Sequence, residues 1–75
     1  MAKLPKISGK KLISILEKDG FELIRTKGSH HFLKHKDGRF TVIPAHSNED
    51  LGPGIIMKIL KDCELTKENF RKLLE

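Results

Sequence analysis

Residues 21–44 read FELIRTKGSHHFLKHKDGRFTVIP, and they contain three short segments rich in aromatic and β-branched side chains. The segments are residues 21–26, 30–35 and 39–43, separated by residues that favour turns. Such a pattern is typical of β-strands. Asp37-Gly38 is a strong hairpin signal because both residues tolerate positive φ, and Pro44 ends the third segment because it has no N–H for a ladder. We therefore predict three antiparallel strands.

Helical patterns flank this stretch on both sides. Upstream, Ser8 is suited to cap a helix that stops at Gly20. Its buried stripe is expected to contain Leu12, Ile15 and Leu16, with Ile13 on the flank. This spacing of three and four residues places the apolar side chains on one helical face.

Downstream, Gly52-Pro53-Gly54 is expected to open a second helix, since proline is tolerated in a first turn. Thr66 is expected to cap a short last helix. The predicted buried faces contain Ile55, Ile56, Ile59, Leu60 and Cys63 in the second helix, and Phe70, Leu73 and Leu74 in the last. The order α-β-β-β-α-α predicts an α+β fold, with helices on one face of the sheet and the other face open.

The sequence leaves the register of the predicted hairpin open. If Asp37-Gly38 forms a two-residue turn, Leu33 pairs with Val42 and His30 lies opposite Ala45. One face then contains His31, Leu33, His35, Phe40 and Val42, and the other contains His30, Phe32, Lys34, Thr41 and Ile43. A three-residue turn would mix these sets. In either case His30 and His31 point to opposite faces.

The 75 residues predict one domain, 1–75, which hides only roughly 60% of the surface of its unfolded chain. Residues 1–46 contain ten Lys/Arg and four Asp/Glu, a charge of +6, whereas residues 47–75 contain five and six, a charge of −1. A basic half favours a polyanionic partner over a membrane. The lone Cys63 fits a reducing cytoplasm, and the first residues lead into no apolar stretch typical of a signal peptide or membrane span.

The run Lys27-Gly28-Ser29-His30-His31 is the strongest candidate for chemistry. Imidazole, with an unperturbed pKa of ~6.5, can take and give protons near neutrality. His30 is expected to stay accessible, His31 to pack or bond locally, and His35 to be solvated. His46 is either a second acid/base group or a loop residue. The histidine spacing matches no zinc pattern, so we predict no metal site.

In order and spacing, several segments resemble the HicA (YcfA-like) toxins of bacterial and archaeal toxin–antitoxin pairs. These are Ser8–Leu12, Asp19-Gly20-Phe21, Lys27–Phe32, Ile43-Pro44-Ala45-His46, Leu51–Ile55 with Ile59-Leu60, and Thr66–Phe70. The sequence departs from the family at Cys63-Glu64, where relatives commonly carry a glycine near the end of the second helix.

The resemblance implies a fold like the double-stranded-RNA-binding domain. It also implies a type II toxin that cleaves mRNA independently of the ribosome and arrests growth. The family's catalytic histidine corresponds to His30, with Gly28 and Ser29 as its setting. The implied partners are mRNA and a HicB-like antitoxin that covers the active site.

In the mechanism we expect, the ribose 2′-oxygen attacks the adjacent phosphorus without a metal or small-molecule cofactor. His30 acts as general base or as leaving-group acid. Arg25 and Lys27 neutralise the phosphate, Lys34 and Arg39 hold the backbone, and His46 or water transfers the second proton. The alternatives are a non-catalytic RNA-binding module of the same fold and a domain that binds an acidic protein.

Overall fold

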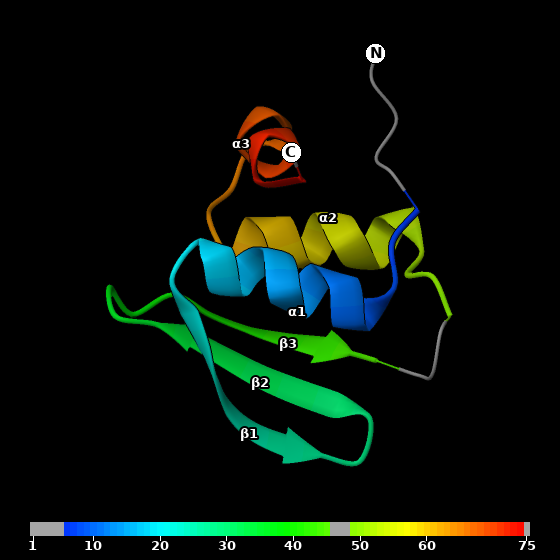
Figure 1. Cartoon of the computed structure of the whole chain (residues 1–75), viewed down its shortest axis with the longest axis vertical. Helices are drawn as coiled ribbons and strands as arrows, with labels where there is room; N and C mark the ends of the chain where they lie inside the picture. The colour runs from blue at the N-terminus through cyan, green and yellow to red at the C-terminus, as the bar shows by residue number, and fades with distance from the viewer. Residues whose placement is uncertain (1–5, 46–48, 75) are drawn as a thin grey trace.

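The structure of the protein is a computed structural model, which describes residues 6–45 and 49–74. Within these residues the chain forms three helices and a three-stranded sheet (Figure 1). In chain order the elements are α1 (Gly9–Lys18), β1 (Phe21–Lys27), β2 (His30–His35), β3 (Phe40–Pro44), α2 (Pro53–Asp62) and α3 (Lys67–Leu74). The predicted order and the α+β class are confirmed. None of the helices in this part of the chain is long and apolar enough to cross a bilayer.

Both ends of α1 follow the sequence signals. The Ser8 hydroxyl accepts a hydrogen bond from the backbone N–H of Lys11 at 3.2 Å, as an N-cap does. After the last turn Gly20 has a φ of +105°, which favours glycine. A Cβ at Gly20 would also come within 2.7 Å of Nε2 of His35. This glycine therefore ends the helix and makes room for a side chain of β2.

The sheet is antiparallel, in the order β1-β2-β3. The turn between β2 and β3 contains three residues, Lys36 to Gly38: the His35 N–H donates to the Arg39 carbonyl at 2.8 Å. A two-residue type I′ turn would need positive φ at both central residues. Gly38 has a φ of +101°, but Asp37 is not among the described residues with positive φ. The register for a two-residue turn is therefore wrong: Leu33 pairs with Thr41 and His30 with Pro44.

This register decides which residues of β3 face the helices. His31, Leu33 and His35 lie on the helix-facing side and His30, Phe32 and Lys34 on the open side, as predicted for β2. In β3 the two-residue prediction is wrong by one position. Thr41 and Ile43, expected beside His30, are 1% and 0% exposed in the core. Phe40 and Val42 take the open side instead.

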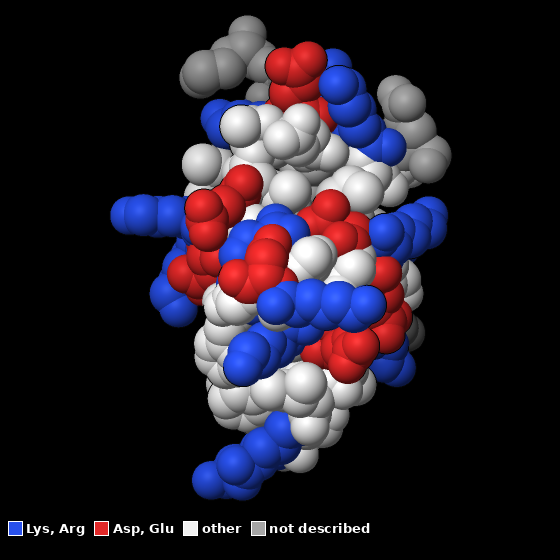
Figure 2. Space-filling view, turned by 90° about the vertical axis from the view of Figure 1, so that its left-hand side faces the viewer, with Lys and Arg blue, Asp and Glu red and all other residues white. Residues whose placement is uncertain are grey.

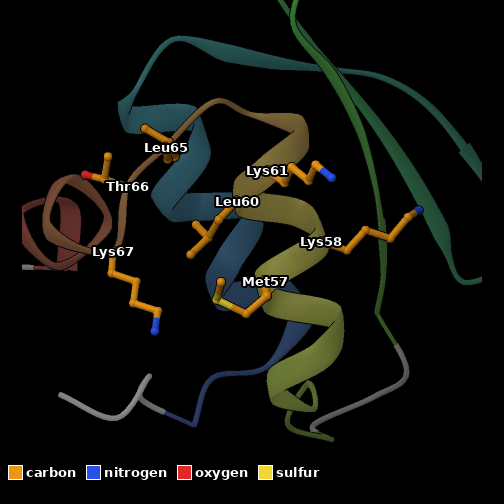
Figure 3. A pocket seen from close by; sticks show the side chains of 7 residues that line it. All are labelled: Met57, Lys58, Leu60, Lys61, Leu65, Thr66 and Lys67. Carbon is orange, nitrogen blue, oxygen red and sulfur yellow. The ribbon is translucent and has the colours of Figure 1, made fainter. Parts of the chain in front are cut away.

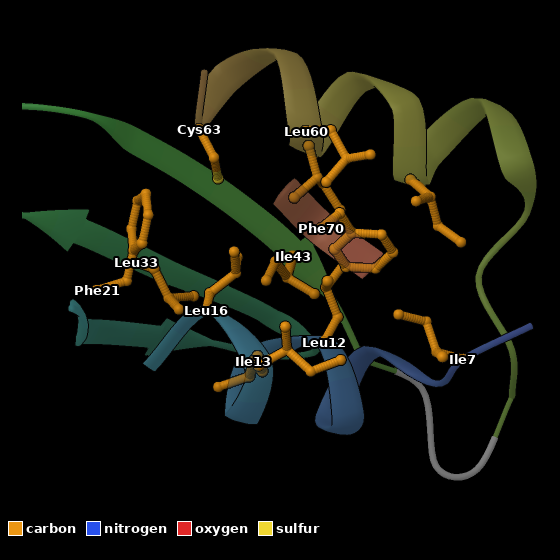
Figure 4. Packing of buried hydrophobic residues seen from close by; sticks show 13 residues of the cluster. Ile7, Leu12, Ile13, Leu16, Phe21, Leu33, Ile43, Leu60, Cys63 and Phe70 are labelled. Atoms are coloured by element: carbon orange, nitrogen blue, oxygen red, sulfur yellow. The ribbon is translucent and has the colours of Figure 1, made fainter. Parts of the chain in front are cut away.

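The core lies between the sheet and the helices (Figure 4). Phe70 of α3 is fully buried and lies among Leu12 of α1, Leu60 of α2 and Ile43 of β3. Cys63 is buried as predicted. Ile55, expected in the core, is 43% exposed because it lies on the outer face of the first turn of α2.

The helix α2 ends where the sequence departs from the HicA pattern. Glu64 has a φ of 54°, the one positive value found at a non-glycine residue in the described part. The Leu65 N–H donates to the Leu60 carbonyl at 2.9 Å, and the Glu64 N–H donates to the Lys61 carbonyl at 3.1 Å. These bonds form the Schellman motif, whose left-handed position favours glycine. Glutamate is accepted here at a conformational cost.

Candidate nucleic-acid interface

His30 is the first residue of β2 and is exposed on the open face of the sheet. Its Cα partners are Lys27 of β1 and Pro44 of β3. Directly opposed residues of an antiparallel pair have Cβ atoms about 4.5–5.5 Å apart on the same face. Within residues 6–45 and 49–74, no hydrogen bond to the His30 ring is found. The ring is thus accessible next to a cationic side chain.

The backbone beside His30 is held by bonds to one carbonyl. The Ala45 N–H donates to the Ser29 carbonyl at 2.8 Å, which ties the β1–β2 turn to the end of β3. Nδ1 of His31 lies 3.1 Å from the same carbonyl and donates to it. The prediction that His31 bonds locally is confirmed. Gly28 has a φ of +60°, and a Cβ there would meet no atom within 4 Å, so the turn needs the conformation of glycine rather than its small size.

A β-bulge in β1 brings two cations to the face of His30. Leu23 pairs with Leu33, but the next paired residue is Arg25, opposite Phe32, so Ile24 is an extra residue. The bulge shifts the alternation by one position. Without it, Arg25 would pair with His31 and point toward the helices. With it, Arg25 and Lys27 share the open face with Phe32 and His30. This irregularity was not predicted from the sequence, because no local signal marks it.

The predicted cations divide into two groups. Arg25, Lys27 and Lys34 are exposed on the open face with His30. Arg39 is not brought together with them, since its side chain is only 16% exposed and points into the fold. Its Nη1 donates to the Cys63 carbonyl at 2.6 Å, and its Nε donates to Oδ2 of Asp37 at 2.8 Å.

Asp37 and Phe21 complete the surroundings of Arg39. The guanidinium lies 5.1 Å from the centre of the Phe21 ring, within cation–π range. The Arg39 backbone N–H donates to Oδ1 of Asp37 at 3.0 Å. This bond, assisted by the guanidinium, is the main cause that lowers the pKa of the Asp37 carboxyl. Arg39 thus closes the β2–β3 turn onto the end of α2.

His35 belongs to the same network, and the prediction that it is solvated is wrong. Its side chain is 19% exposed, its Nε2 donates to the Asp19 carbonyl at 2.9 Å, and its ring contacts Phe21 edge-on at 5.1 Å. The reason is that the turn folds back toward the C-terminal end of α1. Figure 2 looks onto this end of the molecule, where acidic and basic side chains are interspersed.

The start of α1 lies beside the end of β3, which pairs with His30. A Cβ at Gly9 would lie 2.5 Å from the Pro44 carbonyl oxygen and 2.8 Å from Cα of Ala45. Only a residue without a side chain allows this approach. Lys10 and Lys11, both exposed, therefore stand at the same end of the molecule as His30. These two lysines were not among the predicted site residues, and Gly9 is the sequence signal for their position.

His46, predicted as a second acid/base group, lies outside the described residues. In the described part, an open groove of about 630 Å³ lies between α2 and α3, on the helical side of the molecule (Figure 3). Its lining residues are apolar and basic side chains and one threonine: Met57, Leu60, Leu65, Lys58, Lys61, Lys67 and Thr66. None of the residues predicted to act on RNA lines it.

A family model described as the HicA toxin of bacterial toxin–antitoxin systems matches residues 9–65. The chain belongs to the HicA toxin family. The matched range contains α1, the sheet with His30, and α2 through its cap. The segment Thr66–Phe70, which also resembled HicA toxins, follows the matched range. A search of curated proteins gives no match.

Proposed function

We propose that this HicA toxin is a metal-independent endoribonuclease that cleaves mRNA through His30, independently of the ribosome. The observation that carries the proposal is the exposed imidazole of His30 paired with Lys27 on an open sheet face, in a chain of a toxin family. Arg25 and Lys34 stand on the same face. Imidazole and clustered cations are the groups that proton transfer at a phosphodiester needs.

In the proposed reaction the ribose 2′-oxygen attacks the adjacent phosphorus and the 5′-oxygen leaves. His30 takes the 2′-hydroxyl proton or gives one to the 5′-oxygen, and Lys27 stabilises the negative charge that develops on the phosphate. Gly28 and Ser29 form the turn that presents the ring. The second proton transfer is assigned to His46 or to water. DNA lacks the 2′-hydroxyl, so it cannot be cleaved by this route.

The proposal extends to the setting of the reaction. The chain 1–75 acts as a single toxin domain in the cytoplasm, without a small-molecule cofactor. Its proposed protein partner is a HicB-like antitoxin that covers His30 and restores growth. The likeness of the fold to double-stranded-RNA-binding domains remains a prediction.

Substitution of His30 with alanine tests the assignment. The variant is expected to lose about 10²–10⁴-fold in the cleavage rate of a defined mRNA, the contribution typical of general acid–base catalysis. Its circular dichroism and unfolding midpoint should be unchanged, since the ring is exposed. His31→Asn is a matched control, because this side chain points to the opposite face and the asparagine amide can still donate to the Ser29 carbonyl. Wild-type cleavage should persist in EDTA and leave 2′,3′-cyclic phosphate ends.

Three results would contradict the proposal. Near wild-type cleavage by the His30→Ala protein would remove the role of this residue. Strict dependence on added Mg²⁺ would exclude the metal-independent route. RNA binding without any product would favour the non-catalytic RNA-binding module.

A further inference from the structure

Two phenylalanine rings lie on the open face of the sheet in line with His30. Phe32 follows His30 on the same face of β2, about 6.6 Å along the strand at ~3.3 Å per residue. Phe40 lies diagonally across on β3. The two ring centres are 6.1 Å apart, and the ring planes are inclined by 33°. The rings thus form a continuous aromatic surface that begins next to the imidazole.

This surface is accessible. Phe40 is 45% exposed and Phe32 is partly exposed, although their neighbours Thr41 and Leu33 are buried. Single exposed apolar residues are common on soluble proteins. Two aromatic rings in contact, on a sheet face that the described helices leave open, are a more specific arrangement, because exposed apolar patches mark binding surfaces. Val42, the Cα partner of Phe32, extends the patch.

Each row of this face also contains a cation. The register pairs Lys27 with His30, then Arg25 with Phe32, and then Lys34 with Phe40. In this last row Glu22 of β1 lies opposite Lys34, so the excess positive charge of the face comes from Lys27 and Arg25. A cation therefore recurs at every second residue along the strands, beside the imidazole in the first row and beside a phenylalanine ring in each of the next two. A polyanion with one charge per unit and a flat group on each unit fits this alternation. Single-stranded nucleic acid has both features.

We infer that Phe32 and Phe40 form a stacking platform for the bases of single-stranded RNA, with Arg25 and Lys34 on its phosphates. The inference rests on the proposed function, since it concerns the RNA that passes His30. Bases can stack on these rings only when they are unpaired, so single strands are favoured over duplexes. Stacking tolerates every base, so the platform itself imposes little sequence preference.

The test measures RNA binding in the His30→Ala background, where cleavage does not interfere. The probes are a fluorescent RNA of about ten nucleotides, its duplex, and an abasic strand of the same length and charge. Phe40→Ala is expected to weaken single-strand binding roughly 5- to 150-fold, the range for loss of one stacked base. The parent should prefer the strand with bases to the abasic strand, and Phe40→Ala should reduce that preference. Phe40→Trp should restore both.

Ile55→Ala is the matched control, because Ile55 is 43% exposed but lies on α2 on the helical side. It should leave all three affinities unchanged. Circular dichroism checks that each variant is folded. Equal affinity of Phe40→Ala and its parent for the single strand would overturn the inference, as would equal binding of the abasic strand by the parent.

The two proposals fail separately. If Phe40→Ala binds RNA normally while the protein with His30 intact still cleaves mRNA, the platform is wrong and the catalytic assignment stands. If binding depends on Phe40 but the wild-type protein produces no cleavage, the platform stands and the catalytic assignment is wrong. Loss of antitoxin binding by Phe40→Ala, with unchanged RNA affinity, would make this face a protein interface and overturn the inference.

Discussion

Replacement of Arg39 with alanine should destabilise the fold and leave RNA binding nearly unchanged. The guanidinium donates to the Cys63 carbonyl at 2.6 Å and lies 3.4 Å from Oδ2 of Asp19, a buried oxygen without a hydrogen-bond partner among the described residues. It also covers the Phe21 ring. A side chain with these contacts stabilises the fold, whereas RNA binding would require it to point toward solvent.

The magnitude follows from the contacts that are lost. A hydrogen bond from a charged donor to a carbonyl contributes about 1.5–3 kcal/mol. The cation–π contact with Phe21 contributes about 0.5–1 kcal/mol. The exposed pair with Asp37 adds little, because water competes for both groups. Since such terms are not additive, we expect a total loss of about 3 kcal/mol. At 4–8 °C per kcal/mol for a chain of this size, Tm falls by roughly 12–24 °C.

Urea unfolding measures the loss, and the salt dependence of RNA binding provides the second readout. Lys34→Ala is the matched control: Lys34 is exposed on the open face, so this variant should keep its stability but lower the salt slope by ~0.7 for the lost phosphate contact. An Arg39→Ala protein that is as stable as wild type, with a reduced salt slope, would refute the reasoning and return Arg39 to the RNA-binding residues.

Two further predictions concern the cap residue Glu64 and the buried thiol of Cys63. Glu64→Gly should raise the free energy of unfolding by about 1 kcal/mol in urea, because glycine adopts the left-handed φ of 54° without the cost of a side chain; an unchanged or lower value would contradict this account of the cap. Burial raises the pKa of the Cys63 thiol from 9.0 to about 12, so the native protein should react with iodoacetamide at pH 8 far more slowly than the protein in urea. Because the folded state holds this proton more tightly, the stability contributed by Cys63 is complete below pH 9 and is lost as the pH rises toward 12. Rapid labelling of the native thiol would contradict both statements.

The elements could be predicted from the sequence because their signals are local. The Ser8 cap, Gly20 and Pro53 bound helices through bonds and dihedral angles within a few residues of each signal. The surroundings of Arg39 and His35 could not be predicted in this way. Their partners, Cys63 and Asp19, are 24 and 16 residues away in the chain, and only the closed fold brings them together.

The sequence also could not predict which face of the sheet each residue of β1 and β3 points to, for a different reason. Side chains of a strand alternate, so one residue more or less reverses every position that follows. The turn at residues 36–38 and the bulge at Ile24 are two such irregularities, one on each side of β2. Neither changes which residues form strands, so a pattern of apolar residues does not reveal them.

Both irregularities act on the same face, and this links the stability of the fold to the candidate site. The bulge turns Arg25 and Lys27 toward His30, and the three-residue turn places Phe40 beside Lys34 with Thr41 in the core. A shift of the β3 register by one residue would expose Ile43, at a cost in buried apolar surface, and a shift in β1 would turn Arg25 and Lys27 away from the face of His30. The Asp37–Arg39 contacts hold the turn in the observed register. Arg39→Ala keeps the bond from the Arg39 backbone N–H to Asp37 and should preserve this register, whereas Asp37→Ala removes both contacts and is expected to weaken RNA binding through the register of β3.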